Sequence, residues 1–482
     1  MKIHSLVLPL LGLLLVSGCT ANAPFRTLHS LSPPSCEANP ERQENPDCSI
    51  STSISTSKYD VLFVEFDDLG LLHPRKKPYR SVIDASSCQD DIRHAPSSCF
   101  EHPQINQLMM SLDAIAEKAG SQGLSIALFA HGWKHNAHHD DKNLHDFRRQ
   151  LSIAAQVEAM STKRRVVGIY LGWRGSSLTW PLVQNITFWD RKAVAERVAE
   201  GSAIELLSRL HGFWDWRNRL SASEKLRRGE IRFILIGHSF GGLVLFNALS
   251  HQLVNALTRS PGQTAAPDRF FDMVVLLNPA FHATRWVPIH RVLAAQTDAW
   301  QHYAAPLLIL ITADSDWATR IAFQFGRALN SVFESELGQE EADINKKTPG
   351  HVLDYVTYTL ERTDNGVEPC EGWKPAEEIS DPAKSEEQTK VNLDVENKHR
   401  SRYFDPYRQP NGEIVLPMNW ARSFCGGARV VHQRDRLSPH SPVWNVRVTD
   451  KEIINGHNDI AKPILTNLLR QLYVDSIRFP SR

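Results

Sequence analysis

Six short apolar runs constrain the fold of this chain most. Each is rich in Ile, Val, Leu or Phe and is continuous rather than alternating, which is typical of strands buried on both faces of a parallel sheet. The segments 105–120, 147–160 and 191–210 between them have helical spacing of apolar residues. The runs lie at 59–68, 124–133, 165–173, 231–239, 270–279 and 306–314. The alternation predicts an α/β fold, with a mostly parallel central sheet and helices on both faces.

The N-terminus has the features of an export signal. Lys2 precedes an eleven-residue apolar run at 6–16, which is shorter than the roughly 20 residues of a spanning helix. The run leads into Val-Ser-Gly-Cys, ending at Cys19. This resembles the lipobox of bacterial lipoproteins, which implies a signal peptide at 1–18, acyl chains on Cys19, and anchoring to a membrane of the bacterial cell envelope, on its periplasmic or outer-membrane face. An ordinary cleaved signal with a chance cysteine is the alternative.

Composition divides the rest of the chain into a tether and a body. Residues 19–57 are rich in Ser, Pro, Thr and Asn, which predicts a lipidated N-terminus and a flexible tether. Residues 58–482 form the predicted domain. Within it, 363–425 interrupts the pattern, and the stretch 361–400 carries 11 acidic and 6 basic residues. We expect a polar, solvated insertion there.

Charge and cysteine content restrict the partners and the redox state. The chain has 54 basic and 54 acidic residues, so no nucleic-acid partner is expected. Six cysteines besides Cys19 are an even number, which in an exported chain favours disulfides over free buried thiols. The CxxC spacing that would indicate a structural zinc site is absent from the sequence. Clustering along the chain favours the pairs Cys36–Cys48, Cys88–Cys99 and Cys370–Cys425.

The sequence Gly237-His238-Ser239-Phe240-Gly241 joins an apolar strand candidate to an apolar helix candidate. In this context it is typical of a nucleophile elbow, a turn so sharp that small residues are needed two positions either side of the serine. The turn lifts the Ser239 hydroxyl clear of the sheet. The alternative is a glycine-rich corner with an incidental serine.

A serine nucleophile needs a base that is oriented by a carboxylate. The chain offers Ser, Asp and His in that order, which resembles the α/β-hydrolase superfamily over residues 59–475. The resemblance implies a serine esterase or lipase-like site. His457, between a glycine and an asparagine before a C-terminal helix, is the implied base. Asp316, three positions after Ala313, is the implied acid, and Asp314 is the alternative acid.

The same resemblance implies two backbone N–H donors for the oxyanion. One is Phe240, directly after the serine, and the other is Trp133, after His131 and Gly132. The chain lacks the HGGG stretch of some esterases. Its "HGWKHN", "GWRG" and "DWAT" stretches are similar to those of fungal and bacterial α/β hydrolases of unassigned role.

A histidine-rich stretch at 131–147 could suggest a metal site. His135 and His139 have i,i+4 spacing, but HExxH is absent and Asp140, Asp141, Asn and Gly disfavour a continuous helix. We expect a polar loop at the mouth of the site, with no metal and no cofactor.

The aromatic segment 172–189 lies at the end of a strand and could cover the site. Trp173, Trp180, Phe188 and Trp189 would form an apolar cap over an acyl chain, or else fill the core beneath the next helix. Together these features predict a serine hydrolase acting on an ester or lipid-like substrate. An acyltransferase with the same triad, or a non-catalytic envelope binding or scaffold lipoprotein, are the alternatives.

Overall fold

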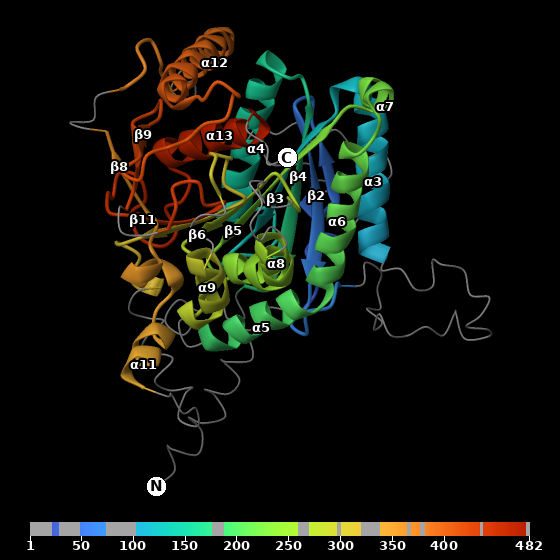
Figure 1. Ribbon diagram of the computed structural model, residues 1–482. Coiled ribbons are helices and arrows are strands. Elements are labelled where there is room, and N and C mark those ends of the chain that lie inside the picture. The colour runs from blue at the N-terminus through green and yellow to red at the C-terminus, as the bar shows by residue number, and fades with distance from the viewer. Residues whose placement is uncertain are drawn as a thin grey trace, which may run out of the picture.

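The computed structural model describes residues 22–27, 49–73, 103–175, 188–258, 269–295, 300–319, 338–363, 368–375, 381–433 and 437–478. Its central feature is an eleven-stranded sheet (Figure 1) with the order β1-β2-β4-β3-β5-β6-β7-β11-β8-β10-β9. The strands from β2 to β8 in this order are parallel, and β1, β10 and β9 pair antiparallel at the two edges. The predicted α/β class and mostly parallel sheet are therefore confirmed.

The strands agree with the apolar runs of the sequence. The six predicted strands are present as β2 to β7, and the region of His457 is preceded by β11. The strands are β1 (Ser53–Ser55), β2 (Tyr59–Phe66), β3 (Leu124–Ala130), β4 (Arg165–Trp173), β5 (Ile231–His238), β6 (Met273–Leu277), β7 (Leu308–Ala313), β8 (Tyr358–Arg362), β9 (Ala421–Ser423), β10 (Ala428–His432) and β11 (Val443–Val448).

Several of the helices begin at polar caps. Asp141 accepts the Asn143 N–H at the start of α4, and Ser221 and Glu224 form a capping box at α7. The helices are α3 (Pro103–Ala119), α4 (Lys142–Met160), α5 (Phe188–Glu200), α6 (Ser202–Asn218), α7 (Ala222–Arg228), α8 (Phe240–Thr258), α9 (Val287–Ala295), α11 (Gln339–Asn345), α12 (Pro382–Phe404) and α13 (Pro463–Arg478). The predicted helix 191–210 is thus two helices, α5 and α6.

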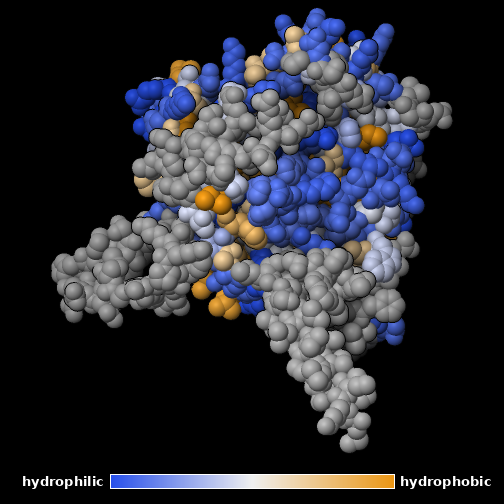
Figure 2. All heavy atoms as spheres, turned by 180° about the vertical axis from the view of Figure 1, so that it is seen from behind, coloured by the Kyte–Doolittle hydropathy of each residue, from blue (hydrophilic) through white to orange (hydrophobic). Residues whose placement is uncertain are grey.

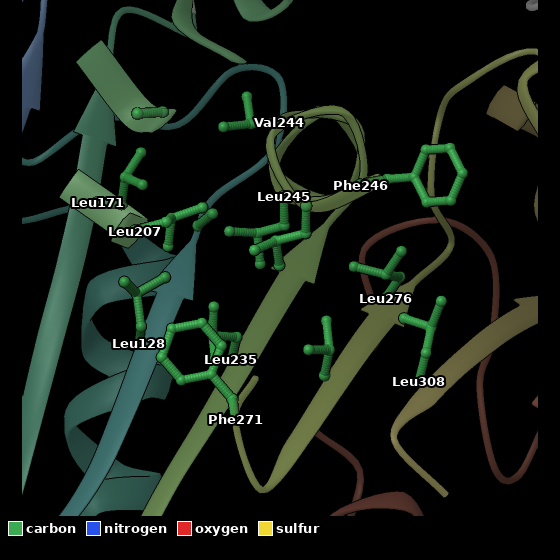
Figure 3. Close-up of a cluster of buried hydrophobic side chains, with 14 of the residues drawn as sticks. Leu128, Leu171, Leu207, Leu235, Val244, Leu245, Phe246, Phe271, Leu276 and Leu308 are labelled. Atoms are coloured by element: carbon green, nitrogen blue, oxygen red, sulfur yellow. The ribbon is translucent and has the colours of Figure 1, made fainter. Parts of the chain in front are cut away.

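The two faces of the sheet are covered differently. One face packs against α3, α5, α6, α8 and α9 in one continuous apolar cluster, part of which Figure 3 shows around Leu235, Leu245 and Leu276. The other face packs against α4 at one end and against α13 at the other, in two separate clusters. Buried apolar area stabilises the fold by about 25 cal/mol per Å².

The expectation of a flexible tether through residue 57 is wrong for the described part of that segment. Arg26 is fully buried, and the backbone N–H groups of Phe25 and Arg26 donate to the Glu65 carboxylate at 2.8 Å each. β1 pairs with β2. A buried carboxylate that accepts two backbone hydrogen bonds holds this segment on the body. Cys19 and the predicted signal peptide lie outside the described residues.

The expectation of a solvated insertion at 363–425 is also corrected. The segment contributes β9 to the sheet, and α12 packs against α4. Its buried Arg400 donates to the equally buried Asp475 of α13 at 2.5 Å, and Cys370 is disulfide-bonded to Cys425. The segment is therefore polar in composition but integrated into the body. The cysteines of the other two predicted pairs lie outside the described residues.

The described surface residues are mostly polar on the face that Figure 2 draws. The hydrophobic groups on that face are small and scattered. Among the described residues, none of the helices combines the length and the hydropathy needed to cross a membrane.

Candidate active site

Ser239 occupies the turn between β5 and α8. β5 ends at His238 and α8 begins at Phe240, so the serine lies alone between strand and helix. Its φ of 55° is in the left-handed region, which is costly for a residue with a side chain. Its N–H donates to the Leu277 carbonyl and its own carbonyl accepts from Ala280, at 3.0 Å each. The neighbouring strand therefore holds the strained turn in place.

The glycines of the motif are required by close backbone approach. A Cβ on Gly241 would lie 2.0 Å from the Ala130 carbonyl oxygen, and a Cβ on Gly237 would lie 2.8 Å from the Gly241 oxygen. Gly132 meets the serine itself, since its Cβ would lie 2.7 Å from the Ser239 Cβ. Any larger residue at these positions would displace the turn or the loop after β3.

The structure brings Ser239, His457 and Asp316 together from three distant parts of the chain. Ser239 Oγ lies 2.7 Å from His457 Nε2, and His457 Nδ1 lies 2.8 Å from Asp316 Oδ2. An ionised carboxylate only accepts, so the Nδ1–H donates to Asp316 and Nε2 is left to accept the serine proton. This hydrogen-bonded chain has the geometry that activates a serine hydroxyl.

Asp316 is fully buried yet favours its ionised form. Burial by itself raises the pKa of this carboxyl, but the charge of His457 and the hydrogen bonds from His457 and Thr319 bring the pKa below its ordinary value. The Thr319 backbone N–H donates to Oδ1 at 3.1 Å, and the Thr319 hydroxyl donates to Oδ2 at 2.6 Å. Both carboxylate oxygens are thus fixed in place.

Asp314, the alternative acid, is placed elsewhere. Its two oxygens accept from Arg447 Nε and Nη2 at 2.6 and 2.7 Å, which makes a bidentate ion pair between the ends of β7 and β11. Of the two aspartates, Asp316 is therefore the one in contact with His457.

Three residues that sequence reasoning missed hold the His457 loop. Asn278 donates from Nδ2 to the Gly456 and His457 carbonyls at 3.2 and 3.0 Å, and its Oδ1 accepts the Ala313 N–H. Ser315 Oγ accepts the Gly456 N–H at 2.8 Å. His238 Nε2 donates to the His457 carbonyl at 2.9 Å. The only signal in the sequence was position, because each follows or ends a core strand.

His238 and His131 are buried neutral imidazoles. Burial, and then the charge of His457, lower the pKa of His238 well below its ordinary value. Burial lowers the pKa of His131 to about 4. His131 Nδ1 donates to the Gly132 carbonyl at 2.9 Å and its Nε2 accepts the Trp173 N–H at 3.0 Å. Both histidines therefore shape the loops around Ser239.

The two residues predicted to bind an oxyanion through their backbone N–H groups belong to the turn after β5 and the loop after β3. Phe240 is the first residue of α8, where backbone N–H groups lack partners within the helix and the helix dipole is positive. Trp133 follows Gly132, the glycine that packs against Ser239. Phe240 thus directly follows Ser239 in the chain, and Trp133 directly follows the glycine that contacts it.

The aromatic segment and the histidine-rich loop are described only in part. Trp173 lies in the core, where its Nε1–H donates to the His131 carbonyl, so it is not part of a cap. Trp180 and the side chains of Phe188 and Trp189 lie outside the described residues.

In the histidine-rich loop, His135 Nδ1 lies 3.1 Å from the Asp141 carboxylate. His138, His139 and Asp140 lie close enough to one another to share an ion, but they are partly or fully exposed.

The sheet topology defines a mostly parallel α/β protein with a Ser, His and Asp constellation at the carboxyl edge of its strands. A comparison of structures finds phospholipase PlaB from Legionella pneumophila, solved in complex with thio-NAD, at 17% sequence identity and a TM-score of 0.22. The match covers 50% of this chain and 47% of that one, so this chain spans about half the length of that phospholipase. No known protein family and no curated protein sequence matches the chain. The fold class is therefore assigned from the sheet itself.

Proposed function

We propose that this protein is a serine hydrolase of the α/β-hydrolase type that cleaves carboxylic esters through an acyl-enzyme. The observation that carries the proposal is the unbroken chain of short hydrogen bonds from Ser239 Oγ through His457 to Asp316. The strained backbone of Ser239 adds support, because strain of this kind collects at functional positions.

In the proposed mechanism His457 removes the Ser239 proton as Oγ attacks the ester carbonyl. Asp316 keeps the imidazole in the correct tautomer and stabilises the imidazolium. The imidazolium then protonates the leaving alcohol, and an acyl-serine remains. Water, deprotonated by His457, releases the acid. The Phe240 and Trp133 N–H groups stabilise the tetrahedral oxyanion. Each step uses groups of this chain and needs no cofactor.

A fluorophosphonate probe tests the nucleophile. We expect the wild-type protein to be labelled and Ser239→Ala and His457→Ala to lose labelling and esterase turnover. Ser250→Ala is the matched control, because its hydroxyl lies on α8, the helix that follows Ser239, and donates to the Asn247 carbonyl. Labelling of Ser239→Ala at the wild-type level would remove the basis of the proposal and leave a non-catalytic binding role.

The substrate class we propose is a lipid-like or small ester. A panel of p-nitrophenyl esters of increasing acyl length measures the preference for chain length. Adding an alcohol or amine acceptor and analysing the products separates hydrolysis from acyl transfer, since a transferase yields the new ester or amide instead of the free acid.

We also propose that Cys19 carries the lipid that anchors the protein in a bacterial cell envelope. The support is the Val-Ser-Gly-Cys ending of the apolar N-terminal run. Metabolic labelling with palmitate in a bacterial host should mark the wild type and Cys36→Ser, the control, but not Cys19→Ser. Equal labelling of Cys19→Ser would disprove the assignment.

A further inference from the structure

A cavity of about 560 Å³ lies on the face of the sheet that α4 and α13 cover. Its floor is formed by Ala127, Ile234 and Ile236, in the central strands β3 and β5. These side chains are half-buried, whereas Phe233 and Leu235, which point to the opposite face, are fully buried. The strand prediction of burial on both faces is therefore wrong here. The central strands of a sheet covered by helices normally pack directly against those helices. Partly exposed side chains at this position therefore need an explanation.

The cavity separates the two apolar clusters of this face. One cluster includes α4 and the other includes α13, and Ile236 and Ile460 contact both. On the opposite face the corresponding strands lie under one continuous cluster. Interiors are ordinarily packed with few voids larger than a water molecule. A gap between two well-packed clusters is therefore a built feature of this fold.

The dimensions of the cavity select its occupant. It is lined along α4 from Asn143 to Met160, a distance of about 25 Å at 1.5 Å per residue. That volume is the space open to the centres of water molecules, so over that length it gives a mean width of about 8 Å between the walls, against the 10–12 Å diameter of a helix. An extended peptide would leave its backbone N–H and C=O groups unpaired on the apolar floor. A single extended hydrocarbon chain meets neither objection.

The polar groups of Ser125, Tyr473 and Asn143 are not available to a ligand. Ser125 Oγ and Tyr473 Oη lie 3.2 Å apart and hydrogen-bond to each other. Asn143 Oδ1 has no hydrogen-bond partner among the described residues, but it has almost no accessible surface and so does not face the cavity. The lining around the apolar floor therefore favours the hydrocarbon part of a ligand.

The cavity is separate from the proposed catalytic centre but close to it. Ser239, His457 and Asp316 do not line it. Leu277, which does, accepts the Ser239 N–H through its carbonyl, and Ile460, another lining residue, follows His457 by three positions. A ligand there would pack beneath the catalytic loops without entering the reaction.

We propose that this cavity is a binding site for one long hydrocarbon chain of a lipid. The chain extends between α4 and α13 over Ile234 and Ile236. This binding site goes beyond the proposed hydrolase and does not require Ser239 to react.

The experiment uses delipidated protein and the fluorescent fatty acid cis-parinaric acid. Saturable binding of one probe per chain is expected for the wild type and equally for Ser239→Ala, so loss of catalysis and loss of binding are separable. Ala154→Trp fills the cavity from α4 and should weaken binding at least tenfold. Ala159→Trp makes the same change on an exposed position of the same helix and should bind as the wild type does. Val157→Phe, a smaller filling change, covers the case in which Ala154→Trp fails to fold.

Competition with monoolein and oleate tests recognition of the hydrocarbon chain, which the two compounds share. Both should displace the probe, and at concentrations within about tenfold of each other, because the apolar floor contacts the chain. Absence of saturable binding to the wild type, or equal binding by Ala154→Trp and Ala159→Trp with both folded, would overturn the site. Failure of both monoolein and oleate to displace the probe would also overturn it.

Discussion

Replacing Asp316 by asparagine tests the proposed triad at its least obvious point, the identity of the acid. Both carboxylate oxygens accept from Thr319, Oδ1 from the backbone N–H and Oδ2 from the hydroxyl. The backbone N–H can only donate, whereas the hydroxyl can rotate and accept. In Asp316→Asn the amide oxygen is therefore expected at the Oδ1 position, and the NH₂ group at the Oδ2 position, facing His457.

That orientation reverses the tautomer of His457. An NH₂ group 2.8 Å from Nδ1 requires Nδ1 to accept, so the proton moves to Nε2 and the ring can no longer take the Ser239 proton. The same exchange in a serine protease, a different protein, lowers kcat on the order of 10⁴-fold. We expect a comparable loss in kcat/KM here, which is about 5 kcal/mol of transition-state stabilisation.

The assay is hydrolysis of p-nitrophenyl butyrate by the full chain, with thermal unfolding of each variant to establish folding. Asp314→Asn is the matched control, two positions away. It removes a half-buried ion pair with Arg447, which contributes at most about 1 kcal/mol to stability, and should retain activity within about threefold. A folded Asp316→Asn with more than a tenth of wild-type activity, or an inactive Asp314→Asn, would refute the assignment.

Three further predictions concern stability. Asn278→Ala removes three side-chain hydrogen bonds, two of them to the His457 loop, and places alanine at a φ of 43°. The free energy of unfolding in urea should fall by about 3 kcal/mol, and a fall of less than about 1 kcal/mol would contradict the role of Asn278 in holding the loop. Gly241→Ala puts a Cβ 2.0 Å from a backbone oxygen at the end of β3 and should cost more than about 3 kcal/mol, whereas Gly212→Ala, in open space on α6, should stabilise by up to about 1 kcal/mol; similar unfolding midpoints for the two would rule out this steric account. The pKa of His131 is about 4 in the folded state against 6.5 in the unfolded state, so the unfolded state binds more protons between these values and stability falls as pH falls below 6.5. This group should make the free energy of unfolding about 2 kcal/mol lower at pH 5 than at pH 8, as measured by urea denaturation. Equal stability at both pH values would show that the buried ring is not linked to folding.

Much of the fold could be predicted because its signals are local. Continuous apolar runs located the central strands, since a strand buried in a parallel sheet has no polar face to interrupt the run. The strands β1, β8, β9 and β10 were missed because buried and partly exposed residues alternate along them, which leaves no continuous apolar run. The insertion was misjudged because its buried charges, such as Arg400 and Asp475, are paired across 75 positions of sequence, and composition counts a paired buried charge as a solvated one.

The candidate site was predicted to different depths at different residues. Ser239 was marked by the glycines that its turn requires, and the order of Ser, Asp and His suggested His457. The sequence favoured Asp316 over Asp314 as the acid but could not decide between them, because both follow the same strand. Asn278 carried no recognisable pattern, since its importance comes from the groups it reaches, not from its neighbours in sequence. Thr319 lies in the DWAT stretch, but the sequence did not show that it would hold the Asp316 carboxylate.

The sequence by itself determined the alternation of strands and helices and the sharp turn at Ser239. Both follow from sterics and hydrophobicity within a few adjacent residues. Only the tertiary structure decided which aspartate contacts His457, how its loop is held, and that the floor of β3 and β5 remains open between α4 and α13. A half-buried isoleucine facing a cavity has the same sequence signature as a fully buried one, because the volume that packed helices leave between them is set by segments hundreds of residues apart.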